Sequence, residues 1–316
     1  MYNLFMENYW ILLAFGSCVF AGATSILAKI GIKNVDSHFA TAIRTCVVAA
    51  IACIFAAALG QFESIDNISK RSYILLILSG LATGGSWICY FYALKNADAS
   101  KVAPIDKSST ILAILLATII FPDEAFNEIT VVGLVGIAMG TVMMLGLPRK
   151  AINEDMNKAH KIEISEEEIK AKKKEFRGLI FALLSAIFAA FTSILAKLGM
   201  EDVPSQLGTA LRTLVVLILA WGLVLLNFKH KKEPYTMDKK SFLYLILSGI
   251  TTGLSWVCYY AALKFGKASV VIPIDKLSIV ITVLFAWIVL KEKPTLSSVV
   301  GLVLITAGTL TLVLGA

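Results

Sequence analysis

The chain has 316 residues, of which 58% are hydrophobic and 16% are charged, whereas about a quarter of the residues in a soluble globular domain are charged. Its formal net charge is +7, but the basic residues are concentrated in short segments between apolar runs and do not indicate a nucleic-acid partner. This composition excludes an ordinary soluble domain and predicts a protein that lies largely within a bilayer.

Ten apolar runs of about 20 residues follow one another, each long enough to cross a bilayer as a helix. They lie near 9–31, 38–60, 72–95, 99–121, 128–147, 177–199, 206–227, 241–264, 268–290 and 296–315. The N-terminal segment has no basic region, and the first run is too long for a cleavable signal, so we expect that run to remain as a span. The predicted fold class is an all-α polytopic membrane protein.

The two halves of the chain repeat one another at an offset of 168 or 169 residues. The matching segments are TSILAKIG (24–31) with TSILAKLG (192–199), ATAIRTCVV (40–48) with GTALRTLVV (208–216), ILSGLATGGSWICYFYALK (77–95) with ILSGITTGLSWVCYYAALK (246–264), and VAPIDKSSTI (102–111) with VIPIDKLSIV (271–280). Because each copy has five helices, an odd number, the second copy must enter the membrane from the opposite face. The halves are therefore predicted to be inverted repeats, an architecture common in secondary transporters.

The duplication defines the domains: a first five-helix repeat over 1–147, a charged linker over 148–176 and a second repeat over 177–316. Within the linker, Ser165 and Glu168 have the spacing of a capping box, which predicts a short surface helix leading into the sixth span. A solvated linker is favoured over a role in binding lipid or a partner. Most lysines and arginines outside the spans fall on the linker's side, which predicts a cytoplasmic linker and external termini.

Charged residues inside the spans are expensive and mark functional sites. Six bases and two acids remain there, each with a counterpart in the other half. The directions of the helices place one group toward the linker side, namely Lys29, Arg44, Asp106 and Lys107 with Trp87 and Tyr90. They place the other toward the opposite face, namely Lys197, Arg212, Asp275 and Lys276 with Trp256 and Tyr259. We expect two equivalent polar clusters that form the substrate path and its gates.

Pairing within each cluster follows from helix geometry. Neighbouring residues on a helix do not face each other, so we expect Asp106 to pair with Arg44, and Asp275 with Arg212. Lys107 and Lys276 are then left for substrate or backbone carbonyls. Lys29 and Lys197 lie nearer the helix ends, where snorkelling to the interface is an equal alternative.

Prolines and small residues accompany these charges. Pro104 and Pro273 either interrupt a helix or occupy its first turn. The glycines of GLATG (80–84), GITTG (249–253) and GIAMG (136–140) are interpreted as close helix packing. The hydroxyl residues near mid-span could line a polar cavity or bond to their own backbone. They are Ser79, Thr83, Ser86, Ser248, Thr252 and Ser255.

These motifs, above all ASKVAPIDKSS (99–109) and ASVVIPIDKLS (268–278), resemble the EamA-domain branch of the drug/metabolite transporter superfamily. The resemblance implies a secondary transporter whose third, fourth, eighth and ninth helices, with parts of the first and sixth, line a central path. The resemblance is specific for the family but says little about which substrate is transported. Members of the family are often described with cytoplasmic termini, the reverse of the orientation that the loop charges predict.

No phosphate loop, dinucleotide fingerprint, nucleophile elbow or metal-ligand spacing occurs, so neither an enzyme nor a cofactor nor a metal site is expected. The excess of buried bases favours a small polar substrate with a carboxylate or phosphate, such as an amino acid, organic acid or phosphorylated metabolite. The alternative is a broad exporter of cationic or neutral drugs, and a non-transporting receptor is a third reading. The expected partners are the lipid bilayer of the cell membrane, the substrate and, as a candidate, a coupling proton.

Overall fold

The computed structural model describes residues 9–32, 35–96, 105, 108–121, 123, 128–144, 166–228, 236–290 and 296–315. All of the regular secondary structure in these ranges is helical. The first half contains α2 (Tyr9–Gly31), α3 (Ser37–Ala58), the 3₁₀ helix η1 (Gln61–Asn67), α4 (Lys70–Asn96), α6 (Ser109–Ile120) and α7 (Glu128–Met144). The second half contains α9 (Glu166–Gly199), α10 (Ser205–Phe228), α11 (Lys239–Phe265), α12 (Ala268–Lys276), α13 (Ser278–Leu290) and α14 (Leu296–Leu314).

Eight candidate spans are long and apolar enough to cross a bilayer, with α12 and the start of α13 together forming one of them. Two shorter apolar helices, Ser109–Ile120 and Glu128–Met143, occupy the positions of the fourth and fifth predicted spans. The remainder of the run predicted at 99–121 lies mostly outside the described residues. The protein is an integral membrane protein with two helical halves, as the apolar runs predict.

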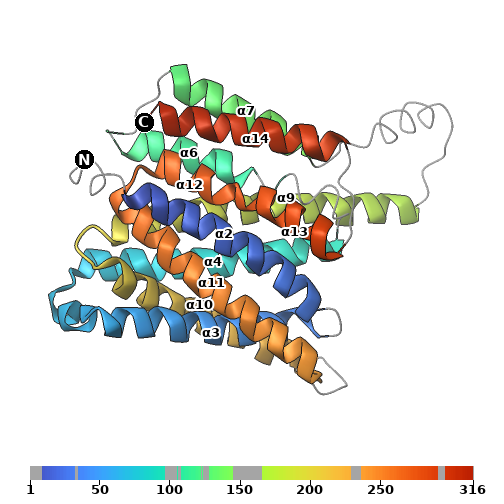
Figure 1. Ribbon diagram of the computed structural model, residues 1–316. Coiled ribbons are helices and arrows are strands. Elements are labelled where there is room, and N and C mark those ends of the chain that lie inside the picture. Colours follow the sequence, from blue (N-terminus) through green and yellow to red (C-terminus); the bar gives the residue numbers. More distant parts are fainter. Residues whose placement is uncertain are drawn as a thin grey trace.

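The two ends of the helix bundle can be named from the chain (Figure 1). α2 begins and α14 ends at one end, here called the termini side, whereas α9 begins at the other, here called the linker side. α9 is one continuous helix of 34 residues, so the predicted separate surface helix is instead the first part of the sixth span's helix. Ser165, the predicted cap, lies outside the described residues.

Acidic caps fix where two helices begin. The Asp36 carboxylate accepts hydrogen bonds from the backbone N–H groups of His38 and Phe39 at the start of α3. Asp238 accepts from the Ser241 backbone at the start of α11, and hydrogen bonds from Ser241 hold the pKa of Asp238 below its usual value. Such caps satisfy N–H groups that have no partner within the helix.

The helices of the two halves interleave rather than forming two separate bundles. α4 packs most extensively on α9, and α11 packs on α2, so each third helix of a half lies against the first helix of the other. α3 packs on both α10 and α11, and α7 pairs with α14 along one edge of the bundle (Figure 1). The membrane core is therefore shared by both repeats.

Glycines allow these contacts between halves. A Cβ at Gly80 in α4 would lie 2.7 Å from Val215 in α10, and one at Gly249 in α11 would lie 2.7 Å from Val47 in α3. The two contacts are related by the repeat. Small residues permit backbones in a membrane to approach closely, which supports the packing interpretation of GLATG and GITTG.

The fourth helix of the second half is broken beside its charges. α12 begins at Ala268, so Pro273 lies inside a helix that has already formed rather than in its first turn. α12 ends at Lys276, and the Leu277 N–H bonds the Ile274 carbonyl at 3.0 Å in a tight turn before α13. Pro104, the equivalent proline, lies outside the described residues.

Candidate functional site

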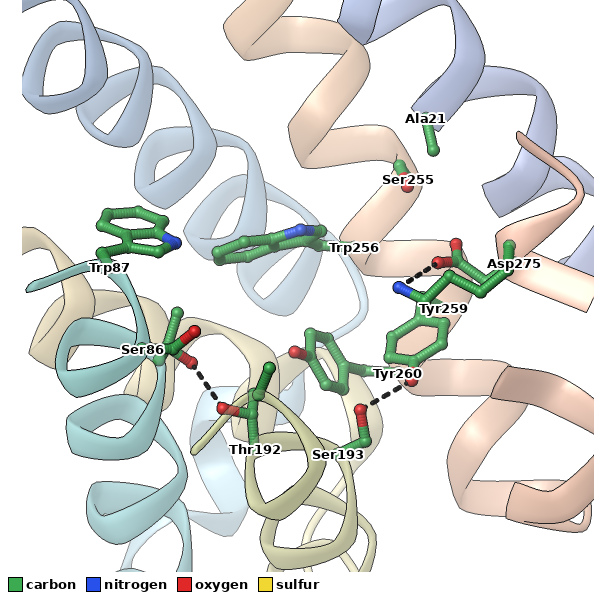
Figure 2. Close-up of a pocket in the computed structure, with 13 residues that line it drawn as sticks. Ala21, Ser86, Trp87, Thr192, Ser193, Ser255, Trp256, Tyr259, Tyr260 and Asp275 are labelled. Atoms are coloured by element: carbon green, nitrogen blue, oxygen red, sulfur yellow. Dashed lines mark hydrogen bonds and ion pairs between the residues drawn. The ribbon is translucent and has the colours of Figure 1, made fainter. Parts of the chain in front are cut away.

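One cavity of about 240 Å³ lies where helices of both halves meet. Its walls come from α2, α4, α9, α11 and α12 (Figure 2). The lining residues are Ala21, Thr83, Ser86, Trp87, Ala189, Thr192, Ser193, Ser255, Trp256, Tyr259, Tyr260, Asp275 and Lys276. Trp87, which was predicted to lie in the linker-side cluster, shares this cavity with four residues that were predicted for the opposite one.

The prediction of two separate clusters is therefore wrong for these residues. The reason is the interleaving of the halves, which brings α4 of the first repeat beside α9 of the second. Trp87, Trp256 and Tyr259 consequently face a common space (Figure 2). The site is a single polar cavity that both repeats build.

Asp275 and Lys276 bring opposite charges to the cavity at the end of α12. The Ser17 hydroxyl of α2 donates to Asp275 Oδ1 at 2.7 Å, and the Ser17 and Ser255 hydroxyl oxygens are 3.1 Å apart. Lys276 Nζ lies 3.8 Å from Asp275 Oδ2. The expectation that adjacent residues cannot pair is thus wrong here, because the helix ends at Lys276 and its long, flexible stem reaches back.

Aromatic rings form the wall beside these charges. The Tyr259 hydroxyl lies 2.9 Å from the Ser193 hydroxyl of α9 (Figure 2). The ring of Tyr260 stands edge-on to both neighbours, with centroid distances of 5.0 Å to Tyr259 and 6.2 Å to Trp256. Aromatic faces of this kind bind apolar groups and cations.

Arg212 lies behind this wall and is fully buried. Its Nε donates to the Ser79 hydroxyl at 3.2 Å, and its Nη2 donates to the Thr83 hydroxyl at 2.9 Å. The guanidinium carbon lies 4.1 Å from the centroid of the Tyr260 ring, and Nη1 has no hydrogen-bond partner among the described residues. An arginine is thus held by two hydroxyls and an aromatic face.

The predicted ion pair between Arg212 and Asp275 is wrong in this conformation, in which both residues are described. Arg212 turns toward α4 of the other half, while Asp275 turns toward Ser17 of α2. The prediction assumed partners within one repeat. The close approach at Gly80 instead brings α10 against the hydroxyl residues of α4.

Arg44 repeats this arrangement in the first half. Its Nη2 donates to the Thr252 hydroxyl of α11 at 3.0 Å, and Thr252 is the counterpart of Thr83. Arg44 is only half-buried, and its Nε has no hydrogen-bond partner within the part of the chain that the structure describes. The predicted partner Asp106 lies outside the described residues, as does Lys107, and the side chain of Lys29 is likewise outside them.

Two other predicted residues lie away from the cavity lining. Lys197 Nζ donates to the Gly266 carbonyl at 2.6 Å, just after α11, and lies 4.7 Å from the centroid of the Phe121 ring. Tyr90 packs with Phe181 against the buried residues Ala93 and Ala182. Neither residue lines the cavity in this conformation.

Sequence reasoning missed Ser17, Ala21, Ala189, Thr192, Ser193 and Tyr260. Thr192 and Ser193 lie within the repeated TSILAK segment, so their retention in both halves was a usable signal. Ser17 carries the same signal, because its counterpart at the repeat offset is Ser185, which pairs with Ser86 as Ser17 pairs with Ser255. Thr83, Ser86 and Ser255 do line the cavity, as one of the two open alternatives proposed.

Comparison with known proteins identifies the family. The model of the EamA-like transporter family matches residues 8–146 and 176–314. The chain belongs to the EamA-like transporter family. An uncharacterized transporter from a Sinorhizobium species is 39% identical over 139 residues, which cover 44% of this chain and 98% of that protein. A single EamA repeat can thus make up nearly all of a relative.

Another relative aligns along nearly the whole chain. An uncharacterized transporter from Archaeoglobus fulgidus is 25% identical over 305 residues, covering 96% of this chain and 98% of its own. A crystal structure with 18% identity aligns over 98% of both chains with a TM-score of 0.75, which establishes a shared fold. This EamA-like protein is a membrane transporter, and the family implies transport rather than enzymatic chemistry.

Proposed function

We propose that the protein is a secondary active transporter that moves a small amino acid, or a metabolite of similar charge, by alternating access. The observation that carries the proposal is the cavity of about 240 Å³ walled by helices of both inverted repeats. A site between inverted repeats can be exposed to either side when one repeat rocks against the other. Its volume is below the usual range for drug-sized ligands, which favours a small solute.

The charges of the cavity favour a zwitterion. Asp275 offers a carboxylate to an ammonium group, and Lys276, whose side chain is 45% exposed, offers an ammonium to a carboxylate. Hydroxyls and aromatic rings surround both. An organic acid or a phosphorylated metabolite would use Lys276 alone and leave Asp275 repelling it, so these two classes fit the site less well.

We infer that the access route from the termini side is closed in this conformation, and the burial of apolar side chains there supports alternating access. The largest cluster of buried apolar side chains among the described residues lies at the termini side, around Leu76, Leu207, Leu263 and Ile274. Arg212 is buried there, whereas its counterpart Arg44 at the linker side is half-buried. This asymmetry supports a state in which the cavity is reached from the linker side.

The second candidate, export of cationic drugs, is favoured by one feature. Asp275 and the rings of Trp87, Trp256, Tyr259 and Tyr260 would together suit a lipophilic cation. In this case the ammonium group of Lys276 would repel the substrate rather than bind it. The two candidates therefore differ in the role of one side chain.

Thermal unfolding of the purified protein tests the substrate class, because a ligand that binds the folded state raises the melting temperature. The panel contains amino acids, organic acids, sugar phosphates and organic cations. We expect stabilisation by an amino acid that Asp275→Asn and Lys276→Gln both abolish and that the control Lys240→Gln, at an exposed site outside the cavity, retains.

Each other outcome has a defined meaning. Stabilisation by organic cations that is lost in Asp275→Asn but kept in Lys276→Gln supports the drug exporter. Stabilisation by any ligand that survives both substitutions contradicts the proposed site. Counterflow of the stabilising ligand in liposomes then separates a transporter from a receptor that only binds.

A further inference from the structure

A second cleft, separate from the central cavity, lies where α4 ends beside the first part of α9. It has a volume of about 330 Å³ and is lined by Tyr92, Asn96, Lys173, Lys174 and Arg177. Three of these five side chains are cationic, and none is acidic. The cleft is therefore a concentration of positive charge at the linker side of the protein.

The three cations share one face of α9. Residues 173 and 174 are four and three positions before Arg177, the spacings that bring side chains together on a helix. All three are exposed, and among the described residues they have neither an ion pair nor another polar partner. Glu175, the acid between them in sequence, does not line the cleft.

Like charges gathered in this way repel one another, so the arrangement favours an anion between them. Capping the carboxyl end of α4 is the alternative use of these cations. At that end the Asn96 side chain already donates to the Tyr92 carbonyl at 2.7 Å. An anion that accepts several hydrogen bonds at once, such as a phosphate group, would satisfy the cations better than scattered carbonyls.

The cleft lies at the level of the membrane at which lipid headgroups are found. The candidate span of α9 begins at Lys172, so the cations lie within its first turns, at the level of the membrane interface. Tyr92 is amphipathic and typical of that level, and its ring packs 4.2 Å from that of Phe181. Further into the span, Ile180 and Leu184 on α9 are 44% and 38% exposed.

A charged site thus leads directly to an exposed apolar surface on the same helix. A free phosphate would use the first part alone, whereas a phospholipid would use both. We propose that the phosphate headgroup of an anionic phospholipid binds this cleft, with an acyl chain along Ile180 and Leu184. The basic loops on this side place it in the leaflet where anionic lipids are enriched, if the linker is cytoplasmic as its charges predict.

The test measures lipid binding to the purified full-length protein by native mass spectrometry, with thermal unfolding as a second readout. The ligands are phosphatidylglycerol, phosphatidylcholine and inorganic phosphate. The variant Lys173→Gln/Lys174→Gln is compared with Lys239→Gln/Lys240→Gln, which removes the same charge from exposed residues at the linker-side start of α11.

We expect phosphatidylglycerol to bind in preference to phosphatidylcholine and to raise the melting temperature. The cleft variant should bind it about thirtyfold more weakly, as expected for the loss of two surface cations near a membrane, and the control variant should bind it normally. Because all four lysines are exposed, both variants should unfold at the wild-type temperature without lipid.

Two results would overturn the proposal. Equal weakening in both double variants would mean that the whole basic face attracts anionic lipid without a specific site. Stabilisation by inorganic phosphate equal to that by phosphatidylglycerol would assign the cleft to a soluble phosphate compound. A cleft variant that is destabilised without lipid is replaced by Arg177→Gln, which removes one cation and keeps the others.

Discussion

Arg212 and Arg44 show how two copies of one residue can differ in their surroundings. Arg212 donates two hydrogen bonds and stacks on Tyr260 while fully buried. Arg44 is half-buried and donates to Thr252. A guanidinium holds two acceptors in a fixed geometry that a lysine cannot reproduce. A state closed only at the termini side, as we propose, would produce this difference.

We expect Arg212→Lys to lower the melting temperature more than the matched variant Arg44→Lys. Arg212→Lys loses at least one hydrogen bond from a charged donor, worth about 1.5–3 kcal/mol, together with the contact to the Tyr260 ring. Differential scanning fluorimetry in detergent measures both variants. Equal shifts would contradict the inferred asymmetry between the two arginines.

Ser17 orients the acid of the cavity through the hydrogen bond to Asp275 Oδ1 at 2.7 Å. We expect Ser17→Ala to reduce the transport rate about tenfold, which corresponds to the lower end of the value of a hydrogen bond to a charged group. The control is Ser25→Ala on the same helix, whose hydroxyl is at an exposed position and donates to the Ala21 carbonyl. Liposome uptake should separate the two, and equal rates would remove Ser17 from the site.

At the scale of elements, the pair α7 and α14 depends on glycines. A Cβ at Gly140 would lie 2.6 Å from the Gly301 carbonyl oxygen and 2.7 Å from the Ile305 nitrogen, so the backbones themselves would have to separate. We expect Gly140→Ala to destabilise the protein by about 1–3 kcal/mol. Gly222→Ala in α10, where a Cβ meets nothing within 4 Å, should be neutral or stabilising. Thermal unfolding of both variants checks this, and similar effects would refute it.

The break between α12 and α13 is the other element with a distinct role. Pro273 removes an N–H from the interior of α12, and the helix ends after Asp275 and Lys276. A discontinuous helix exposes backbone groups to a substrate in many transporters.

Pro273→Ala restores the N–H that can bond the Ser269 carbonyl. We expect the variant to unfold at the same or a higher temperature, because the helix gains a hydrogen bond. We expect it to transport more slowly, because a more regular helix restricts the movement of Asp275 and Lys276. Pro204→Ala, at a proline just before α10, is the control and should transport normally. An unchanged rate in Pro273→Ala would show that the break does not serve transport.

At the scale of the whole molecule, the inverted repeat predicts a second state. In that state Arg44 would be buried against Ser248 and Thr252, as Arg212 is now buried against Ser79 and Thr83. The linker side would then be closed and the termini side open. Two states of nearly equal free energy are what a repeated sequence provides, because the same contacts are available at both faces.

Labelling from each side of the membrane tests this exchange in a variant without the five native cysteines. Ala189→Cys lines the cavity and should react with an impermeant maleimide only from the side on which the exposed reporter Lys240→Cys reacts. Substrate should then allow labelling from the other side as well. Reaction from the termini side without substrate would contradict the inferred closure, and buried Ala220→Cys should react from neither side.

The sequence by itself determined the features that depend on local pattern. Apolar length determined the spans, the repeat determined the inversion, and the glycine spacing of GIAMG located a close helix contact that Gly140 makes. These follow from residues near one another in the chain, where helix geometry alone decides which side chains share a face.

Only the tertiary structure decided which helices meet. Ser79 and Thr83 of α4 have the same spacing as Ser248 and Thr252 of α11, so each arginine had two equivalent sets of possible partners in the sequence. The structure pairs each with the helix of the other repeat, brings Trp87 beside Trp256 and separates Arg212 from Asp275. Duplication makes helix pairing degenerate in the sequence, and only packing in three dimensions removes that degeneracy.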